Sequence, residues 1–136
     1  MNALVLALVL SASPQTFLVD LAPSSINLSW QEPVLAGAME EVRASPGRQA
    51  FLRRDVDARR AGARFVLALT VAAAGSSALA TVKIVELADG TIVRAGKVAI
   101  PQVTRELCVA EVRRLVREQL EALPLDLPPP EPPKKR

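Results

Sequence analysis

The sequence predicts a single α/β domain of two layers, in which a mixed or antiparallel sheet with a C-terminal β-meander is packed by two main helices. Three observations support this fold class. The chain has 136 residues, which suits one domain, and half of them are apolar. Three β-prone segments separated by turn signals follow one another between residues 64 and 100. Two longer segments, one before and one after them, place apolar residues at helical spacing.

The first part of the domain is predicted to be a strand followed by a helix. Residues 16–21 (TFLVDL) are apolar and β-prone, which predicts a buried strand. Ser29 and Glu32 have the spacing of a capping box, S-x-x-E, at the start of a helix. The apolar stripe of that helix ends before Ser45-Pro46-Gly47, which stops it.

A short strand and a brief helix are predicted next. Residues 49–52 are expected to form the strand. Asp55 is expected to cap a turn of helix that runs through Ala61, and Gly62 ends it.

The meander is predicted from three apolar, β-rich segments, residues 64–74, 79–87 and 92–100. Gly75-Ser76-Ser77 turns the chain between the first two. Asp89-Gly90 turns it between the last two, and predicts a type I′ hairpin, in which both central residues need positive φ.

A second long helix is predicted from Thr104, as its N-cap, through Leu123. Its charged residues lie away from the apolar face, and Glu111 and Glu118 are placed for local ion pairs. The single cysteine, Cys108, is predicted to be a small core residue. The apolar face of this helix consists of Val109, Val112, Val116, Leu120 and Leu123.

Both ends of the chain are predicted to lie outside the domain, which spans residues 14–123. Residues 1–13 are predicted to be a signal peptide, because an apolar run over 3–10 is followed by the cleavage-like Ser11-Ala12-Ser13. The alternative is a buried first strand or helix. Residues 124–136 hold six prolines in thirteen positions and predict a disordered Pro-rich tail of extended polyproline II conformation.

The composition argues against an enzyme, a metal site and a cofactor. The chain has no histidine, which excludes histidine-based triads and histidine metal ligands. One cysteine cannot build a zinc site, and the six glycines form no phosphate-binding loop. The alternative is a hydrolase that uses Asp20, Asp55 or Asp57, which would need two of these carboxylates within reach in a cleft.

An arginine-rich stretch over residues 43–64 carries a net charge of +5, because it holds seven Arg, two Asp and no Glu. Such a surface can meet anionic lipid headgroups, a polyanionic glycan or nucleic acid. Nucleic acid is disfavoured because only Phe51 and Phe65 lie near as stacking aromatics. The alternative is a solvated face. The candidate anion or partner surface consists of Arg53, Arg54, Arg59, Arg60 and Arg64.

Two segments resemble motifs of bacterial envelope proteins. Residues 63–71 (ARFVLALTV) are similar to the "ga-R-Y-V-L-x-G-x-V" strand of TolB N-terminal-like or CsgG/FlgO-like domains. Residues 82–94 (VKIVELADGTIVR) resemble the "L-x-D-x-x-T-G-x-V" hairpin of these domains. The resemblance covers residues 16–123. It implies an α/β sandwich of the periplasm or outer membrane that acts in assembly or as a binding module.

Together these observations predict a non-catalytic, envelope-associated binding or scaffold module that is exported to the periplasm or cell envelope. Its partner is expected to be a protein or an envelope component, and the Pro-rich tail is expected to be a tether. The alternative is a cytoplasmic adaptor or nucleic-acid-associated protein that uses the Arg-rich surface over residues 43–64. The sequence does not predict an oligomeric state.

Overall fold

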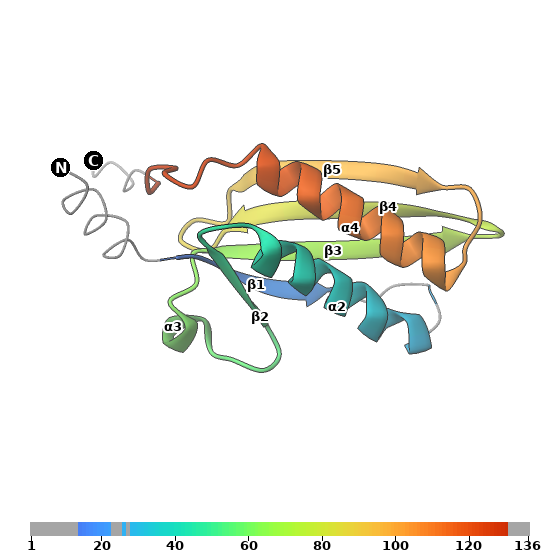
Figure 1. The fold of residues 1–136 in the computed structure, drawn as a ribbon, viewed down its shortest axis with the longest axis horizontal. Coiled ribbons are helices and arrows are strands. Elements are labelled where there is room, and N and C mark those ends of the chain that lie inside the picture. The colour runs from blue at the N-terminus through green and yellow to red at the C-terminus, as the bar shows by residue number, and fades with distance from the viewer. Residues whose placement is uncertain (1–13, 23–25, 27, 131–136) are drawn as a thin grey trace.

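The computed structural model describes residues 14–22, 26 and 28–130 (Figure 1). The predicted signal peptide, residues 1–13, and the last residues of the Pro-rich tail, 131–136, lie outside the described residues. The elements in chain order are β1 (Gln15–Leu21), α2 (Leu28–Ala44), β2 (Arg48–Leu52), α3 (Ala58–Ala61), β3 (Phe65–Ala74), β4 (Ser77–Glu86), β5 (Ile92–Ile100) and α4 (Arg105–Glu121).

The strands form one five-stranded sheet in the order β2-β1-β3-β4-β5. β1 runs parallel to both β2 and β3, whereas β3, β4 and β5 are antiparallel neighbours. Parallel strands need a crossover connection, and α2 supplies it between β1 and β2. The predicted α/β fold, with a mixed sheet that ends in a meander, is therefore confirmed.

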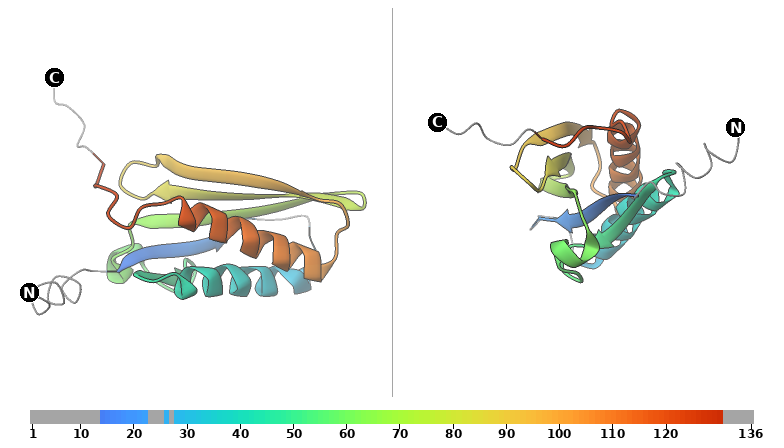
Figure 2. Two further views of the ribbon diagram at one scale, coloured as in Figure 1. Left: turned by 45° about the horizontal axis from the view of Figure 1, so that its top comes forward. Right: turned by 90° about the vertical axis from the view of Figure 1, so that its left-hand side faces the viewer.

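Both long helices lie side by side on one face of the sheet (Figures 1 and 2). The short α3 lies beside the end of the sheet at which β3 begins. Between helices and sheet, the rings of Phe17 and Phe65 stack with centroids 5.3 Å apart, and neither residue is accessible to solvent. Strand residues alternate between faces, so the core receives every second side chain. From the central strand β3 these are Phe65, Leu67, Leu69 and Val71.

An ion-pair cluster joins α2 to α4 at the edge of this core. The side chain of Glu41 on α2 is 8% exposed. It accepts hydrogen bonds from Arg113 Nε at 3.1 Å and from Arg117 Nη2 at 2.8 Å. Arg113 Nη1 also donates to Glu40 Oε2 at 2.9 Å. The two helices are therefore linked by charge-assisted bonds as well as by apolar contact.

This cluster predicts an acid-dependent loss of stability. The hydrogen bond from Arg117 lowers the pKa of the Glu41 carboxyl, burial opposes this, and the hydrogen bond from Arg113 lowers the pKa further. A carboxyl whose pKa is lower in the folded state stabilises the fold above its unfolded pKa. That contribution is lost as the pH falls through the lowered value. We expect the free energy of unfolding of Glu41→Gln to be below that of the parent at neutral pH.

The difference in free energy of unfolding between the parent and Glu41→Gln should shrink once the pH falls below about 4.5. Urea unfolding of both proteins from about pH 7 to about pH 2.5 measures it. Glu40→Gln is the matched control, because its side chain is 64% exposed and, among the described residues, it bonds only Arg113. A difference for Glu41→Gln that stays constant over this range would contradict the assignment.

The opposite face of the sheet carries no helix among the residues that the structure describes (Figure 2). Leu18 and Val66 are paired neighbours on this face and are buried. Leu79 is 43% exposed. Towards β5 the face is built mainly of small and polar side chains, which are Ala68, Thr70 and Ala72 of β3, Leu79, Thr81, Lys83 and Val85 of β4, and Ala95, Lys97 and Ala99 of β5.

α4 approaches β5 closely because Gly96 has no side chain. A Cβ at this position would meet the Gln119 amide and would lie 2.9 Å from Leu115 Cδ1. We expect Gly96→Val to lower the free energy of unfolding by about 1–3 kcal/mol, the usual cost of overpacking. Ala95→Val, at the exposed neighbouring position, is the control and should change it by less than about 0.5 kcal/mol. Equal midpoints of urea unfolding for the two variants would contradict this packing.

Two predicted helix caps are wrong. α2 begins at Leu28, so Ser29 lies inside the first turn and is not the N-cap. The Glu32 carboxylate accepts bonds from Arg54 at 2.7 and 3.1 Å. The N-cap of α3 is Asp57 rather than Asp55, since its carboxylate accepts the N–H of Arg59 at 2.8 Å. Asp57 is the aspartate that directly precedes the first helical residue.

The hairpin between β4 and β5 is confirmed, but its predicted type I′ turn is wrong. Gly90 has a φ of 75°, whereas Asp89 does not have a positive φ. The connection is longer than two residues, and the N–H of Gly90 donates to Glu86 O at 2.8 Å. The Asp89 carboxylate accepts the N–H of Thr91 at 2.9 Å. A single left-handed glycine is therefore enough to close this longer turn.

The N-cap, the local ion pairs and the buried cysteine predicted for α4 are confirmed, whereas the helix ends at Glu121 rather than at Leu123. The hydroxyl of Thr104 accepts the N–H of Leu107 at 3.2 Å as the N-cap. On the solvent side, Arg114 pairs with Glu111 at 2.6 Å and with Glu118 at 2.7 Å. The sheet-facing side buries Cys108, Val112, Leu115, Val116, Gln119 and Leu120.

Candidate partner-binding surface

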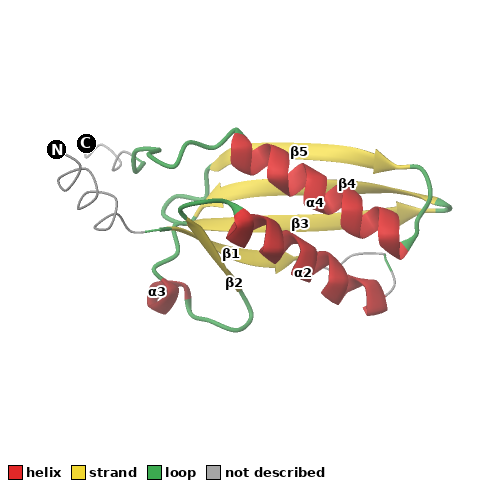
Figure 3. Ribbon diagram, viewed as in Figure 1, coloured by secondary structure: helices red, strands yellow, loops and turns green. Residues whose placement is uncertain are grey.

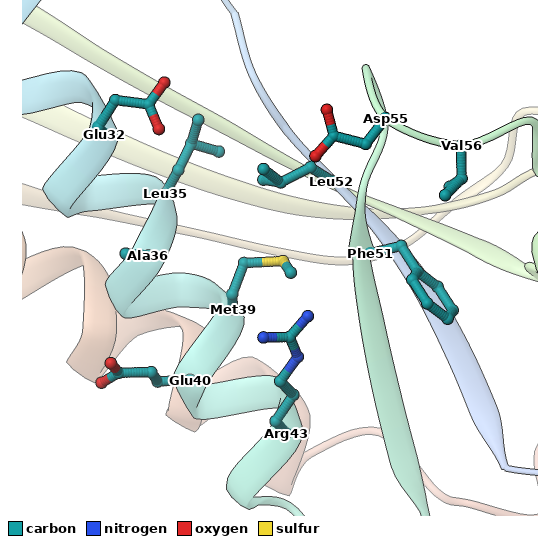
Figure 4. A pocket seen from close by; sticks show the side chains of 10 residues that line it. All are labelled: Glu32, Leu35, Ala36, Met39, Glu40, Arg43, Phe51, Leu52, Asp55 and Val56. Atoms are coloured by element: carbon teal, nitrogen blue, oxygen red, sulfur yellow. The ribbon is translucent and has the colours of Figure 1, made fainter.

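A groove of about 350 Å³ lies between α2 and the edge strand β2 (Figure 4). Met39 and Arg43 reach from α2 toward β2, while Phe51 on β2 turns away from the helix. Carboxylates stand among these apolar groups. The lining residues are Glu32, Leu35, Ala36, Met39, Glu40, Arg43, Phe51, Leu52, Asp55 and Val56.

Local structure explains why these side chains meet. The α2 residues of the groove recur at helical spacing, at i, i+3, i+4, i+7, i+8 and i+11 from Glu32, so they share the side of the helix that turns toward β2. Arg43 is held in place because its Nη2 donates to Ala50 O at 3.1 Å. Glu32, which lines the groove, forms an exposed ion pair with Arg54. The hydrogen bond from Arg54 lowers the pKa of the Glu32 carboxyl, which stays charged at neutral pH.

A second hollow, of about 520 Å³, shares Phe51, Asp55 and Val56 with the first and extends to α3. Arg60 of α3 lines it. The two hollows thus surround the half-buried ring of Phe51, and we call them together the α2–α3 groove. Its apolar floor and charged rim are the features by which proteins recognise a partner with matching chemistry.

The structure separates the five arginines that the sequence grouped as one surface. Arg53 lies 3.5 Å from Asp20, and Arg54 pairs with Glu32. Arg64 pairs with Glu86 at 2.8 Å. These three positive charges are therefore matched within the chain. These three arginines therefore add little to a polyanion-binding surface over residues 43–64. Such a surface stays a prediction for the remaining arginines of this stretch.

Arg59 and Arg60 of α3 are the remaining two. Both are exposed, and no described residue makes an ion pair or a hydrogen bond with either guanidinium group. Arg60 lines the α2–α3 groove, whereas Arg59 lines a hollow on the other side of α3 with Arg64. They are the members of the set that can still meet an external anion.

Arg64 has a role that sequence reasoning missed. Its Nε and Nη2 donate to the Glu86 carboxylate at 2.8 and 3.2 Å, and the Glu86 side chain is only 4% exposed. Its guanidinium lies 4.8 Å from the centroid of the Phe65 ring. It also donates to the carbonyl oxygens of Leu127 at 2.5 Å and Pro128 at 2.6 Å. One side chain therefore joins two strands to the segment after α4.

The start of the Pro-rich tail lies against the domain through further contacts. Arg48 Nη2 donates to Leu123 O, and Gln15 Nε2 donates to Pro124 O at 3.2 Å. Leu127 packs against the core. Residues 124–130 have no helix or strand (Figure 3), and the domain side chains meet their free carbonyl groups. The disorder predicted for the tail stays a prediction for residues 131–136.

Each aspartate of the hydrolase alternative has a partner. Asp20 lies near Arg53, and Asp57 caps α3. Asp55 lies 3.8 Å from Arg54 Nε. Cys108 is fully buried, and burial raises the pKa of its thiol, which disfavours the reactive thiolate. These contacts give the four residues structural roles.

Within residues 14–22, 26 and 28–130, no three His, Cys, Asp or Glu side chains gather as ligands for a metal ion. The helices in this part of the chain lack the length and apolar content needed to cross a bilayer.

Solved structures share this fold. No family model matches the sequence, and no curated protein matches it significantly. The PelC dodecamer from Paraburkholderia phytofirmans is similar, with a TM-score of 0.54, 16% identity, and coverage of 82% of this chain and 88% of that chain. Lipoprotein GNA1162 from Neisseria meningitidis gives a TM-score of 0.50 and 17% identity, over 82% of this chain and 100% of that chain.

TolB from Acinetobacter baumannii gives a TM-score of 0.54 and 9% identity over 84% of this chain. The match spans 30% of that longer chain. The similarity to TolB expected from the sequence is thus confirmed for the fold. The similarity to CsgG/FlgO-like domains stays a prediction. At these identities the comparisons establish a shared fold, which several bacterial proteins use.

Proposed function

We propose that this chain is a non-catalytic binding or scaffold module of the bacterial cell envelope, whose partner is a protein or another envelope component. The observation that carries the proposal is the fold, which covers 82% of the chain in the match to a lipoprotein and 84% in the match to TolB. A fold alone does not define a function, so the surface supplies the second argument.

The α2–α3 groove supports binding rather than catalysis. Its apolar groups are Met39, which is buried in its floor, and the half-buried ring of Phe51, which offers contact area to a partner. Arg43 and Arg54 are held by Ala50 O and Glu32, so they are built into the fold. Within this proposal, Arg59 and Arg60 are the side chains that meet an anionic group of the partner.

The two ends of the chain have proposed roles as well. Residues 1–13 act as the export signal, and the Pro-rich tail acts as a tether. Arg64 and Arg48 fix the start of that tail to the domain, which supports a defined exit point for it.

Site-specific photo-crosslinking tests the proposed binding role. A photoreactive benzoylphenylalanine replaces Phe51 in the groove, and a second variant carries it at the exposed Glu121 of α4 as the control. Both are expressed in the organism that encodes the chain. We expect position 51, and not position 121, to yield an adduct with an envelope protein or component. No adduct at position 51, the same adducts at both positions, or cytoplasmic adducts alone would contradict the proposal.

A further inference from the structure

The two edges of the sheet differ in how their backbone groups are used. At the β2 edge, Gly47 and Arg53 form backbone hydrogen bonds with β1. Alternate residues of a strand direct their N–H and C=O groups to opposite sides, so the backbone groups of Arg48, Ala50 and Leu52 point away from β1. Internal partners occupy that edge. The N–H of Arg48 donates to Ser45 O at 3.2 Å, Ala50 O accepts from Arg43 at 3.1 Å, and Leu52 O accepts from Asp55 at 3.0 Å. Half of the outward backbone groups of β2 therefore already have a partner within the chain.

The β5 edge is open (Figures 1 and 3). The two-residue turn Gly75-Ser76 makes Ala74 and Ser77 a hydrogen-bonded pair, so every second residue of β4 from Ser77 bonds to β3. The alternate residues of β4 bond to β5, and they pair with Arg94, Gly96, Val98 and Ile100.

Three residues of β5 therefore turn their N–H and C=O groups outward, namely Ala95, Lys97 and Ala99. No hydrogen bond within the described residues reaches these outward groups. An unpaired edge of this kind is a template for another strand.

The open edge is basic. Arg94 and Lys97 lie on β5, and Lys83 lies on β4 opposite Ala95. No described carboxylate pairs with any of the three. The only acidic residue of β3, β4 and β5 is Glu86, and it is bound by Arg64. A partner at this edge therefore meets positive charge that the chain itself leaves unmatched.

α4 supports the edge from the core side. Leu115 and Gln119 pack against Gly96 in the middle of β5. Gln119 is 6% exposed, and no described donor reaches its Oε1. A strand paired to β5 would therefore lie beside a backbone that α4 supports from the core side.

We propose that β5 receives an extended, acidic segment of another protein as the next strand of the sheet. This inference rests on the proposed binding role and names the chemistry of the partner. Main-chain bonds to Ala95, Lys97 and Ala99 supply the pairing, and acidic side chains on the face away from the helices meet Lys83 and Lys97. A second copy is the weaker occupant, because antiparallel pairing of two β5 strands brings like charges together.

The test uses the purified full chain and a fluorescent ten-residue peptide in which glutamate alternates with valine or threonine. Fluorescence anisotropy measures its Kd at several salt concentrations. Ala99→Pro removes one outward N–H and leaves the bonds to β4 intact, as edge positions allow. Lys83→Gln/Lys97→Gln removes charge and keeps the backbone. Circular dichroism checks that each variant is folded.

We expect Ala99→Pro to weaken binding about tenfold, the effect of one lost hydrogen bond at an interface. The charge variant should bind more weakly and with a smaller salt dependence. A peptide with lysine in place of glutamate should not bind. A peptide N-methylated at alternate residues should not bind either, and this control does not depend on the folding of Ala99→Pro.

Three results would overturn the inference. In the first, the acidic peptide fails to bind the parent protein. In the second, the acidic peptide binds Ala99→Pro as tightly as it binds the parent protein, and the N-methylated peptide binds the parent protein as tightly as the unmodified peptide does. Alternatively, the chain forms a dimer in sedimentation that Ala99→Pro abolishes, which assigns the edge to a second copy. Because the assay is done in solution, its failure leaves the envelope location and the crosslinks at Phe51 untouched.

Discussion

Replacing Arg64 by alanine is expected to lower the free energy of unfolding by about 3 kcal/mol or more, because it leaves a buried carboxylate without its partner. The Glu86 side chain is 4% exposed, against 27% for Arg64. The variant also loses the bonds to Leu127 O and Pro128 O, so the segment after α4 should be released. Urea unfolding measures the first effect, and limited proteolysis after residue 123 measures the second.

Two further variants make this result interpretable. Arg60→Ala removes an exposed arginine with no described partner, and should change the free energy of unfolding by less than about 0.5 kcal/mol. Arg64→Met/Glu86→Leu removes both charges, and should recover most of the loss because an apolar pair can replace a buried ion pair. The account is contradicted if Arg64→Ala behaves like Arg60→Ala.

Phe17→Ala is expected to destabilise the fold by about 4 kcal/mol, within the range measured for large aromatic residues in cores. Phe17 lies on β1, between β2 and β3, and stacks on Phe65, and neither ring is exposed. Deleting the ring leaves a cavity between the sheet and both helices. Such a loss is a large part of the stability of an ordinary domain.

The matched control is Phe51→Ala, at the half-buried groove position, which should cost at least about 2 kcal/mol less. If Phe17→Ala does not fold, Phe17→Leu provides a milder change that should still lower the urea midpoint. Equal losses for Phe17→Ala and Phe51→Ala would contradict the position of the core.

Much of the fold could be predicted because its signals are local. The strand over residues 16–21, the meander and the cap at Thr104 each follow from adjacent residues, and the structure has them within one or two positions. The order of the strands was not predicted, since β1 lies between β2 and β3 through pairings distant in sequence. Parallel pairing has no local turn signal.

The errors at the caps and turn have a physical basis. Asp55 and Asp57 are both good N-caps, and only the position of the first helical turn selects Asp57. Asp89-Gly90 indicates a turn, but the length of the connection depends on the register of β4 and β5, which contains a shift at Ile84/Val85. One residue of register separates a two-residue turn from a longer one.

The candidate site was harder to predict than the fold. Composition identified a positive stretch over residues 43–64, but charge in the sequence does not reveal which arginines find partners in space. Arg64 and Glu86 are 22 residues apart, and Arg64 and Pro128 are 64 apart. The α2–α3 groove likewise joins a helix to an edge strand, so no local pattern indicates it.

Cell fractionation with intact-mass measurement tests the central claim, a module that acts in the envelope, most directly. The full chain of 136 residues is expressed in a Gram-negative host, and periplasmic, membrane and cytoplasmic fractions are analysed. The account predicts a periplasmic or membrane species whose mass is lower by about the leader over residues 1–13. A full-length species confined to the cytoplasm would contradict it, and would favour the adaptor hypothesis.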